Sequence, residues 1–91
     1  MEEFKNQTLN LEILAEEAAE IIQIKSKIIR FGLYDYHPKN EMPNNEKLEN
    51  EIGHFLAMVD ILVHHGVIHL DNITKGRAEK LIKLKDWYKN E

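Results

Sequence analysis

Three glutamates lie within five residues of one another in the stretch Glu16-Glu17-Ala18-Ala19-Glu20. On a helix, which turns by about 100° per residue, their side chains fall within roughly 100° of arc. Like charges at this spacing repel one another unless a cation or a basic partner neutralises them. The stretch therefore suggests half of a metal site, and the other ligands have to come from elsewhere in the chain.

Glu51 and His54 form a second pair of candidate ligands, and they have the same three-residue spacing as Glu17 and Glu20. If both pairs lie on antiparallel helices, they can face each other across one groove. Oxygen-rich ligands that are partly open to water suit Mg²⁺ or Mn²⁺. Lys27 lies two turns beyond Glu20 on the same face, where it can contact an anionic ligand. The alternative interpretation is that each pair lies on an ordinary solvated helix face.

Three helices are predicted to position these residues. The first runs from Leu9 to about Arg30, the second from Glu46 to about His65, and the third ends near Tyr88. The expected N-caps are Thr8, then Asn44 or Asn45, then Asp71, and the glycines that end the first two helices are Gly32 and Gly66.

Two segments are predicted to lie outside the helices, one at the beginning of the chain and one between the first two helices. Residues 1–7 are polar and are expected to fray. Residues 32–45 contain two prolines and form a predicted loop between helices. A plain crossover is the favoured interpretation of that loop, and a lid over a site is the alternative.

The apolar residues of the first two helices predict broad core stripes. The expected core positions are Leu11, Leu14, Ala15, Ala18, Ile21, Ile22, Ile28 and Ile29, then Leu48, Ile52, Phe55, Leu56, Val59, Leu62 and Val63. Stripes this broad need more cover than three helices supply. We therefore expect a single all-α domain over residues 1–91, an antiparallel helical bundle completed by oligomerisation as a homodimer or a dimer of dimers.

Composition limits the classes of function. The chain has 91 residues, a formal charge of −4 and no cysteine. Disulfides and thiolate metal sites are thereby excluded, and an acidic balance argues against general binding of nucleic acid. No apolar run is long enough for a bilayer, and the acidic first residues lack a signal-peptide core. A cytoplasmic protein that acts neither on membranes nor on nucleic acid is expected.

The two acidic motifs resemble those of the MazG-like family of all-α nucleotide pyrophosphohydrolases. That family is marked by Glu-Glu-x-x-Glu on one helix and Glu-x-x-Asp on a later one. The resemblance extends through Ser26-Lys27-Ile28-Ile29-Arg30-Phe31-Gly32, through the apolar run 55–62, and through a lysine-rich last helix that ends near a tryptophan. It covers roughly residues 9–88, and the loop at 32–45 makes the gap between the motifs long for the family.

The resemblance implies cleavage of a nucleoside triphosphate, canonical or modified, to the monophosphate and pyrophosphate with Mg²⁺ as cofactor. Mg²⁺ neutralises phosphate charge and orients a water for in-line attack, and a carboxylate can accept the proton of that water. Transferred to this chain, Glu17, Glu20 and Glu51 match metal ligands, and Glu16 matches the remaining acid of the first motif. The candidate substrate-binding cations are Lys27, Arg30, Lys80 and Lys83.

His54 departs from the family pattern because it stands where the pattern has aspartate. Imidazole suits Mn²⁺ or Zn²⁺ better than Mg²⁺. Three outcomes are open: a site with altered metal preference, an activity that rests on three glutamates, or a degenerate site. Asp60 lies on the opposite side of its helix from Glu51 and is not a substitute ligand in the same subunit.

Other conspicuous residues have simpler interpretations. His64 and His65 suit a helix C-terminus, although a zinc site with His69 and Asp71 is an alternative. Tyr34, Tyr36 and His37 either stack on a base or pack over the end of the bundle. Lys80 and Lys83 fit a solvated basic face as well as phosphate contact from a neighbouring helix or subunit.

Two functions from other classes compete with the enzyme. One is a catalytically weakened MazG-like module that binds a nucleotide or assembles with other copies, and His54 is the residue that favours it. The other is a small helical DNA-binding or antitoxin-like protein, against which the acidic balance counts.

Overall fold

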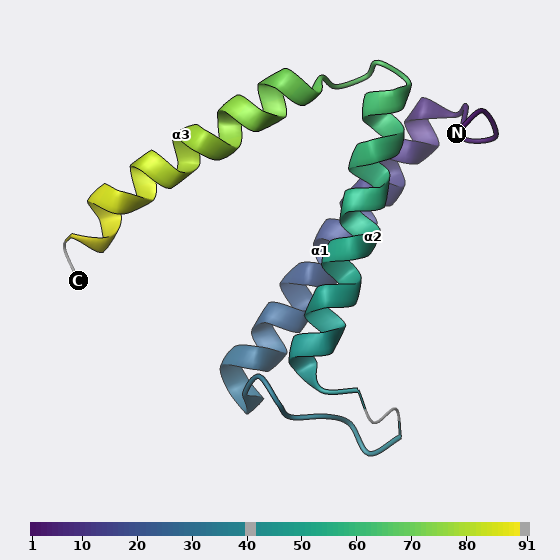
Figure 1. The fold of residues 1–91 in the computed structure, drawn as a ribbon. Coiled ribbons are helices and arrows are strands. Elements are labelled where there is room, and N and C mark those ends of the chain that lie inside the picture. The colour runs from purple at the N-terminus through teal and green to yellow at the C-terminus, as the bar shows by residue number, and fades with distance from the viewer. Residues whose placement is uncertain (40–41, 90–91) are drawn as a thin grey trace.

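The computed structural model describes residues 1–39 and 42–89, so Asn40 and Glu41 of the predicted loop, and Asn90 and Glu91, lie outside it. The described residues form three helices, α1 (Gln7–Phe31), α2 (Asn44–His64) and α3 (Leu70–Tyr88), and no strand (Figure 1). The prediction of an all-helical chain with three main helices is confirmed.

α1 begins before the predicted position. Its N-cap is Asn6, whose side-chain oxygen accepts a hydrogen bond from the backbone N–H of Leu9 at 3.0 Å. The prediction of Thr8 as the cap is wrong, because the helix already begins at Gln7 and Thr8 lies inside its first turn. At the other end, Gly32 ends the helix as predicted. Gly32 has φ of 101°, a conformation that side chains rarely adopt, and its N–H donates to the carbonyl of Ile28 at 2.8 Å.

α2 and α3 begin without side-chain caps. Their N-caps are Pro43 and His69, so the predictions of Asn44 or Asn45 and of Asp71 as caps are wrong. The side chain of Asn44 is used elsewhere, since its amide donates to the carbonyl of Gly32 at 3.1 Å and the residue is buried. Asp71 lies in the first turn of α3, where its charge still favours the helix dipole. Gly66, with φ of 71°, follows the end of α2 as predicted.

α2 folds back along α1 (Figure 1). At the loop end, the backbone N–H groups of Asn44 and Asn45 donate to the carbonyls of Asp35 and Leu33 at 2.9 and 2.8 Å. At the other end, His65 Nε2 lies 2.9 Å from the carbonyl oxygen of Met1. Hydrogen bonds therefore fix both ends of the helix pair, and the side chains between them form the contact.

α1 packs on α2, and we assign to their seam the buried and half-buried residues that recur at alternating three- and four-residue spacing, the pattern of helices that pack at a small angle. All twelve seam residues are buried or half-buried. They are Asn10, Leu14, Glu17, Ile21, Ile24 and Ile28 on α1, and Asn44, Leu48, Glu51, Phe55, Met58 and Leu62 on α2. The other seam positions are apolar except for Asn10 and Asn44, so Glu17 and Glu51 lie among mostly apolar neighbours.

The predicted core stripes were too broad. Ile24, Met58 and Ile61 are buried although none was predicted as a core residue, whereas Ile22 and Ile29 are 60% and 74% exposed. The reason is that, among the described residues, the extensive helix contact of α1 is with α2, so mainly one strip of its surface is covered.

α3 points away from the helix pair (Figure 1), and it contains no buried residue. The radius of gyration is 16.2 Å, compared with about 12 Å expected for a compact chain of this length. Leu81, Ile82 and Trp87 are 64%, 64% and 74% exposed. The third helix therefore leaves its apolar residues without cover in a single copy of the chain.

Candidate metal centre

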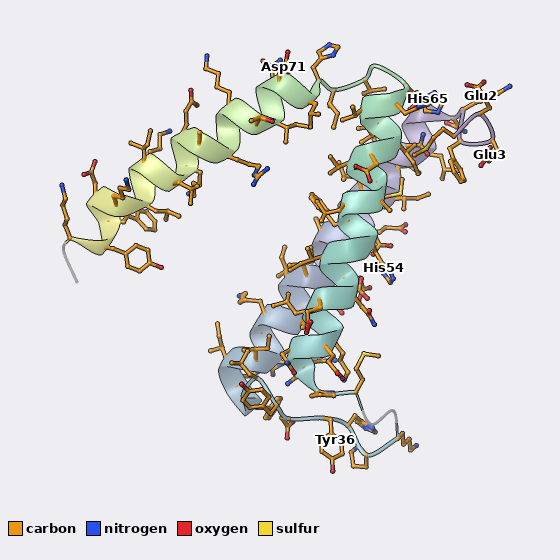
Figure 2. The ribbon with its side chains drawn as sticks, in the orientation of Figure 1. Glu2, Glu3, Tyr36, His54, His65 and Asp71 are labelled. Carbon is orange, nitrogen blue, oxygen red and sulfur yellow. The ribbon has the colours of Figure 1, made fainter. Side chains whose placement is uncertain are left out.

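Three candidate ligands meet midway along the seam. His54 Nδ1 lies 3.3 Å from Glu51 Oε2 on its own helix and 3.5 Å from Glu17 Oε2 on α1. One ligand atom from each of these residues lies within 4.8 Å of the other two. Figure 2 shows His54 halfway along α2, far from both ends of the helix pair. The two motifs identified in the sequence are therefore brought together by the fold.

The two carboxylates are partly withdrawn from water. The side chains of Glu17 and Glu51 are 23% and 21% exposed, whereas that of His54 is 59% exposed. Two unit charges within 4.8 Å of each other repel by about 1 kcal/mol in water and by about 3.5 kcal/mol at an effective dielectric constant of 20. A bound cation at this position would offset the repulsion.

The donor set decides which metals fit. Two carboxylates and one imidazole form a mixed oxygen and nitrogen set that suits Mn²⁺ or Zn²⁺ better than Mg²⁺. The exposed side of His54 leaves room for water or substrate oxygens, as in catalytic metal sites with three protein ligands. The residues therefore fit a divalent cation, with a preference shifted away from the Mg²⁺ that the family resemblance implies.

Glu16 and Glu20 are exposed on α1 and are not part of the Glu17–Glu51–His54 group. Glu20 lies one turn from Glu17, so its role as a ligand stays a prediction, as does the supporting role of Glu16. Asp60 is also exposed and outside the group, in agreement with its helical phase.

A cavity of about 260 Å³ adjoins the candidate ligands Glu51 and His54. It is lined by Ile24, Met42, Lys47, Asn50, Glu51 and His54. Lys47 is a cation that sequence reasoning missed. The available signal was its spacing, because Lys47 lies one turn before Glu51 and four-residue neighbours share a helix face. Lys47 places a positive charge in the wall of the cavity that Glu51 and His54 also line.

Lys47 also lines a second cavity, of about 280 Å³, together with Lys27. Lys27 was predicted to lie on the same helix face as the site. Lys47, on the facing helix, adds a second lysine to this cavity. Asn44 and residues of the 32–39 segment complete the wall of this cavity.

The other predicted cations lie away from the carboxylates. The Arg30 Nε–H donates to the carbonyl of Ser26 at 3.4 Å, and its guanidinium lies 5.2 Å from the centre of the Phe31 ring. Lys80 Nζ lies 5.7 Å from the centre of the Trp87 ring, and Lys80 and Lys83 line a cavity of about 130 Å³ on α3. Because α3 points away from the seam, these lysines do not meet the site of their own chain (Figure 1).

The histidines at the end of α2 are occupied by contacts with the first residues of the chain. His65 lies beside Glu2 and Glu3 (Figure 2), and His64 Nε2 is 3.8 Å from Glu2 Oε1. The rings of His64 and His65 meet edge to face, 4.9 Å apart. Over residues 1–39 and 42–89, these histidines form no group of three converging ligands with His69 and Asp71, so the zinc alternative is not assembled.

No family model, curated protein or solved structure matches this chain. None of the three described helices has the length and apolar character that crossing a bilayer requires. The function of the chain therefore has to be inferred from its residues and their geometry.

Proposed function

We propose that this chain is a MazG-like nucleotide pyrophosphohydrolase that converts a (d)NTP to its monophosphate and pyrophosphate. The observation that carries the proposal is the meeting of Glu17, Glu51 and His54 across the seam. Carboxylates reduce stability at seam positions unless they are compensated, and a substrate-linked cation offers that compensation. A bound divalent cation would supply neutralisation of phosphate charge and activation of a water.

The protein groups have separate roles in this proposal. Glu17, Glu51 and His54 hold the cation, with Glu20 as a further ligand, and Mn²⁺ is accepted alongside Mg²⁺. Lys47 binds phosphate oxygens in the cavity beside Glu51 and His54, and Lys27 binds them on the facing helix. Glu16 or Glu20, both exposed, accepts the proton of the attacking water.

The proposal is tested by pyrophosphate release from a panel of NTPs and dNTPs with Mg²⁺ and with Mn²⁺. Glu51→Gln is expected to lower turnover at least 100-fold, because it removes a ligand charge and keeps the side-chain shape. Glu12→Gln, an exposed acid on α1 outside the group, is the matched control and is expected to retain activity. Equal turnover in the wild type and Glu51→Gln with both metals would overturn the proposal.

A second candidate is a catalytically weakened nucleotide-binding module. It is favoured by the contacts of His54 Nδ1 with both carboxylates, because a protonated imidazole would neutralise them without a metal. Nucleotide binding without pyrophosphate release, and with no effect of Mn²⁺ on thermal stability, would support this module over the enzyme.

We also propose that the active form is a homodimer or a dimer of dimers, an antiparallel bundle in which other copies cover α3 and the free side of α1. The exposed apolar residues Ile22, Ile29, Leu81 and Ile82 support this assembly. In such an assembly, Lys80 and Lys83 of one copy can reach the phosphates held by another. A cytoplasmic location is part of the same proposal.

A further inference from the structure

Residues 32–35, which follow α1, are held in place by hydrogen bonds to their backbone carbonyls. The carbonyls of Gly32, Leu33 and Asp35 all accept hydrogen bonds from Asn44 or Asn45. His37 Nδ1 accepts a hydrogen bond from the backbone N–H of Lys39 at 3.1 Å. The segment 32–39 is thus attached to the start of α2, and the wall that it forms has a defined shape.

The cavity of about 280 Å³ lies between this segment and the helix ends. It is lined by Lys27, Phe31, Asp35, Tyr36, His37, Pro38, Asn44 and Lys47. Two aromatic rings at the loop end, Phe31 and Tyr36, are 60% and 55% exposed. Figure 2 shows Tyr36 on the loop at the end of the helix pair, beyond His54. Aromatic surface and two lysines therefore occur in one cavity.

The charged residues of this cavity distinguish its loop end from the part near Glu51 and His54. Lys47 lines both this cavity and the one beside Glu51 and His54, so a cation lies between the aromatic end and the metal ligands. Asp35 at the loop end disfavours phosphate there and can accept hydrogen bonds from ring or amino N–H groups. A ligand with an anionic end and a planar, N–H-bearing end fits this order of groups.

We infer that the cavity bounded by Phe31, Tyr36 and Lys47 is the base-binding site for a nucleoside phosphate. The base stacks on Tyr36, beside Phe31, and donates to Asp35, while the phosphates extend past Lys27 and Lys47 toward Glu51. This inference deepens the proposed function and takes its orientation from it. It assigns the 32–39 segment to recognition of the base, in place of a plain crossover.

The test is an NMR titration of the metal-free protein, in EDTA, with each of the four 5′-nucleoside monophosphates and with ribose 5-phosphate. The monophosphate that binds most tightly is expected to bind better than ribose 5-phosphate, which has the same phosphate but no base. Tyr36→Ala is expected to weaken that monophosphate at least about fivefold, the lower end of the effect of removing a stacked aromatic. Its affinity for ribose 5-phosphate is expected to stay unchanged.

Three further variants separate base stacking from folding and from phosphate binding. Tyr36→Phe retains the ring and is expected to bind like the wild type. Tyr34→Ala removes a tyrosine of the same segment that is 75% exposed and lies outside the cavity wall, so it is the matched control. Lys47→Met is expected to weaken both the monophosphate and ribose 5-phosphate.

Monophosphates that bind no better than ribose 5-phosphate, or bind Tyr36→Ala as tightly as the wild type, would overturn the base site. The readout needs neither metal nor turnover. Failure of pyrophosphate release would therefore leave the base site standing, and failure of the base site would leave the hydrolase proposal standing.

Discussion

His54 Nδ1 on α2 lies 3.5 Å from Glu17 Oε2 on α1, and this contact links the two sequence motifs across the helix pair. Glu51, one turn before His54, completes the group from the same helix. The two glutamates occupy seam positions at which the neighbouring residues are mostly apolar. The proposed metal site and the stability of the helix pair therefore impose opposite demands on these two positions.

The first prediction concerns the effect of the Glu51 charge on the stability of the metal-free protein. Glu51→Leu is expected to stabilise the metal-free protein by roughly 1–3 kcal/mol, because an apolar side chain replaces one of two repelling charges in the seam. The measurement is thermal unfolding in EDTA. Glu49→Leu, which replaces an exposed glutamate of the same helix, is the control and is expected to change stability little. A destabilised Glu51→Leu would show that the carboxylate is already compensated inside the protein.

The second prediction concerns metal linkage. Mn²⁺ at about 100 times its dissociation constant is expected to stabilise the wild type by about 2.7 kcal/mol. The shift in melting temperature should disappear in Glu17→Gln, because that change removes the ligand contributed by α1. Glu12→Gln, on the same helix and outside the group, should retain the shift. A shift of equal size in both variants would place the metal elsewhere.

The third prediction concerns metal preference. His54→Asp supplies the acid that the MazG-like pattern has at this position, and it is expected to increase Mg²⁺-supported turnover relative to Mn²⁺ by about tenfold, equivalent to about 1.4 kcal/mol. The measurement is the ratio of pyrophosphate release with the two metals. His64→Asp makes the same change at the exposed end of α2 and should leave the ratio unchanged. An unchanged ratio in His54→Asp would exclude His54 from the metal site.

The fourth prediction concerns the hydrogen bond that attaches the segment 32–39, which is proposed to bind the base, to the start of α2. Asn44→Ala removes a buried amide that donates to the carbonyl of Gly32, and it is expected to cost about 1–3 kcal/mol of stability. Asn72→Ala, at an exposed asparagine on α3, is the control. Denaturant unfolding measures both variants, and equal stabilities would show that the segment is not held by this bond.

The fifth prediction concerns assembly. Leu81→Glu combined with Ile82→Glu is expected to reduce the mass measured by light scattering to that of one chain, because charges replace apolar residues that other copies are proposed to cover. Lys85→Glu changes the charge of the same helix at an exposed polar position and should leave the mass unchanged. A wild type that is already monomeric would contradict the proposed assembly.

The helices and their ends show what periodicity alone can predict. The three helices and the glycines at 32 and 66 followed from apolar spacing and backbone preference, because both act locally. The first residues of the helices could not be predicted in this way. The N-cap positions are Asn6, Pro43 and His69. Asn44, which was predicted as a cap, instead forms a long-range hydrogen bond that no local rule indicates.

The buried core and the candidate site likewise could not be predicted in full from local spacing. Spacing placed Glu51 and His54 on one face, but only the pairing of α1 with α2 decides that Glu17 meets them. It also decides that Ile24 and Met58 are buried while Ile29 is exposed. Lys47 was missed because its importance comes from the two cavities that it lines, and cavities are made by segments distant in the sequence.

The most direct test of the account is a crystal structure of the protein soaked with Mn²⁺ and examined by anomalous scattering. We expect a peak within bonding distance of one oxygen of Glu17, one oxygen of Glu51 and a nitrogen of His54. A structure with no peak there, in which His54 still contacts both carboxylates, would contradict the claim that this group is a metal centre.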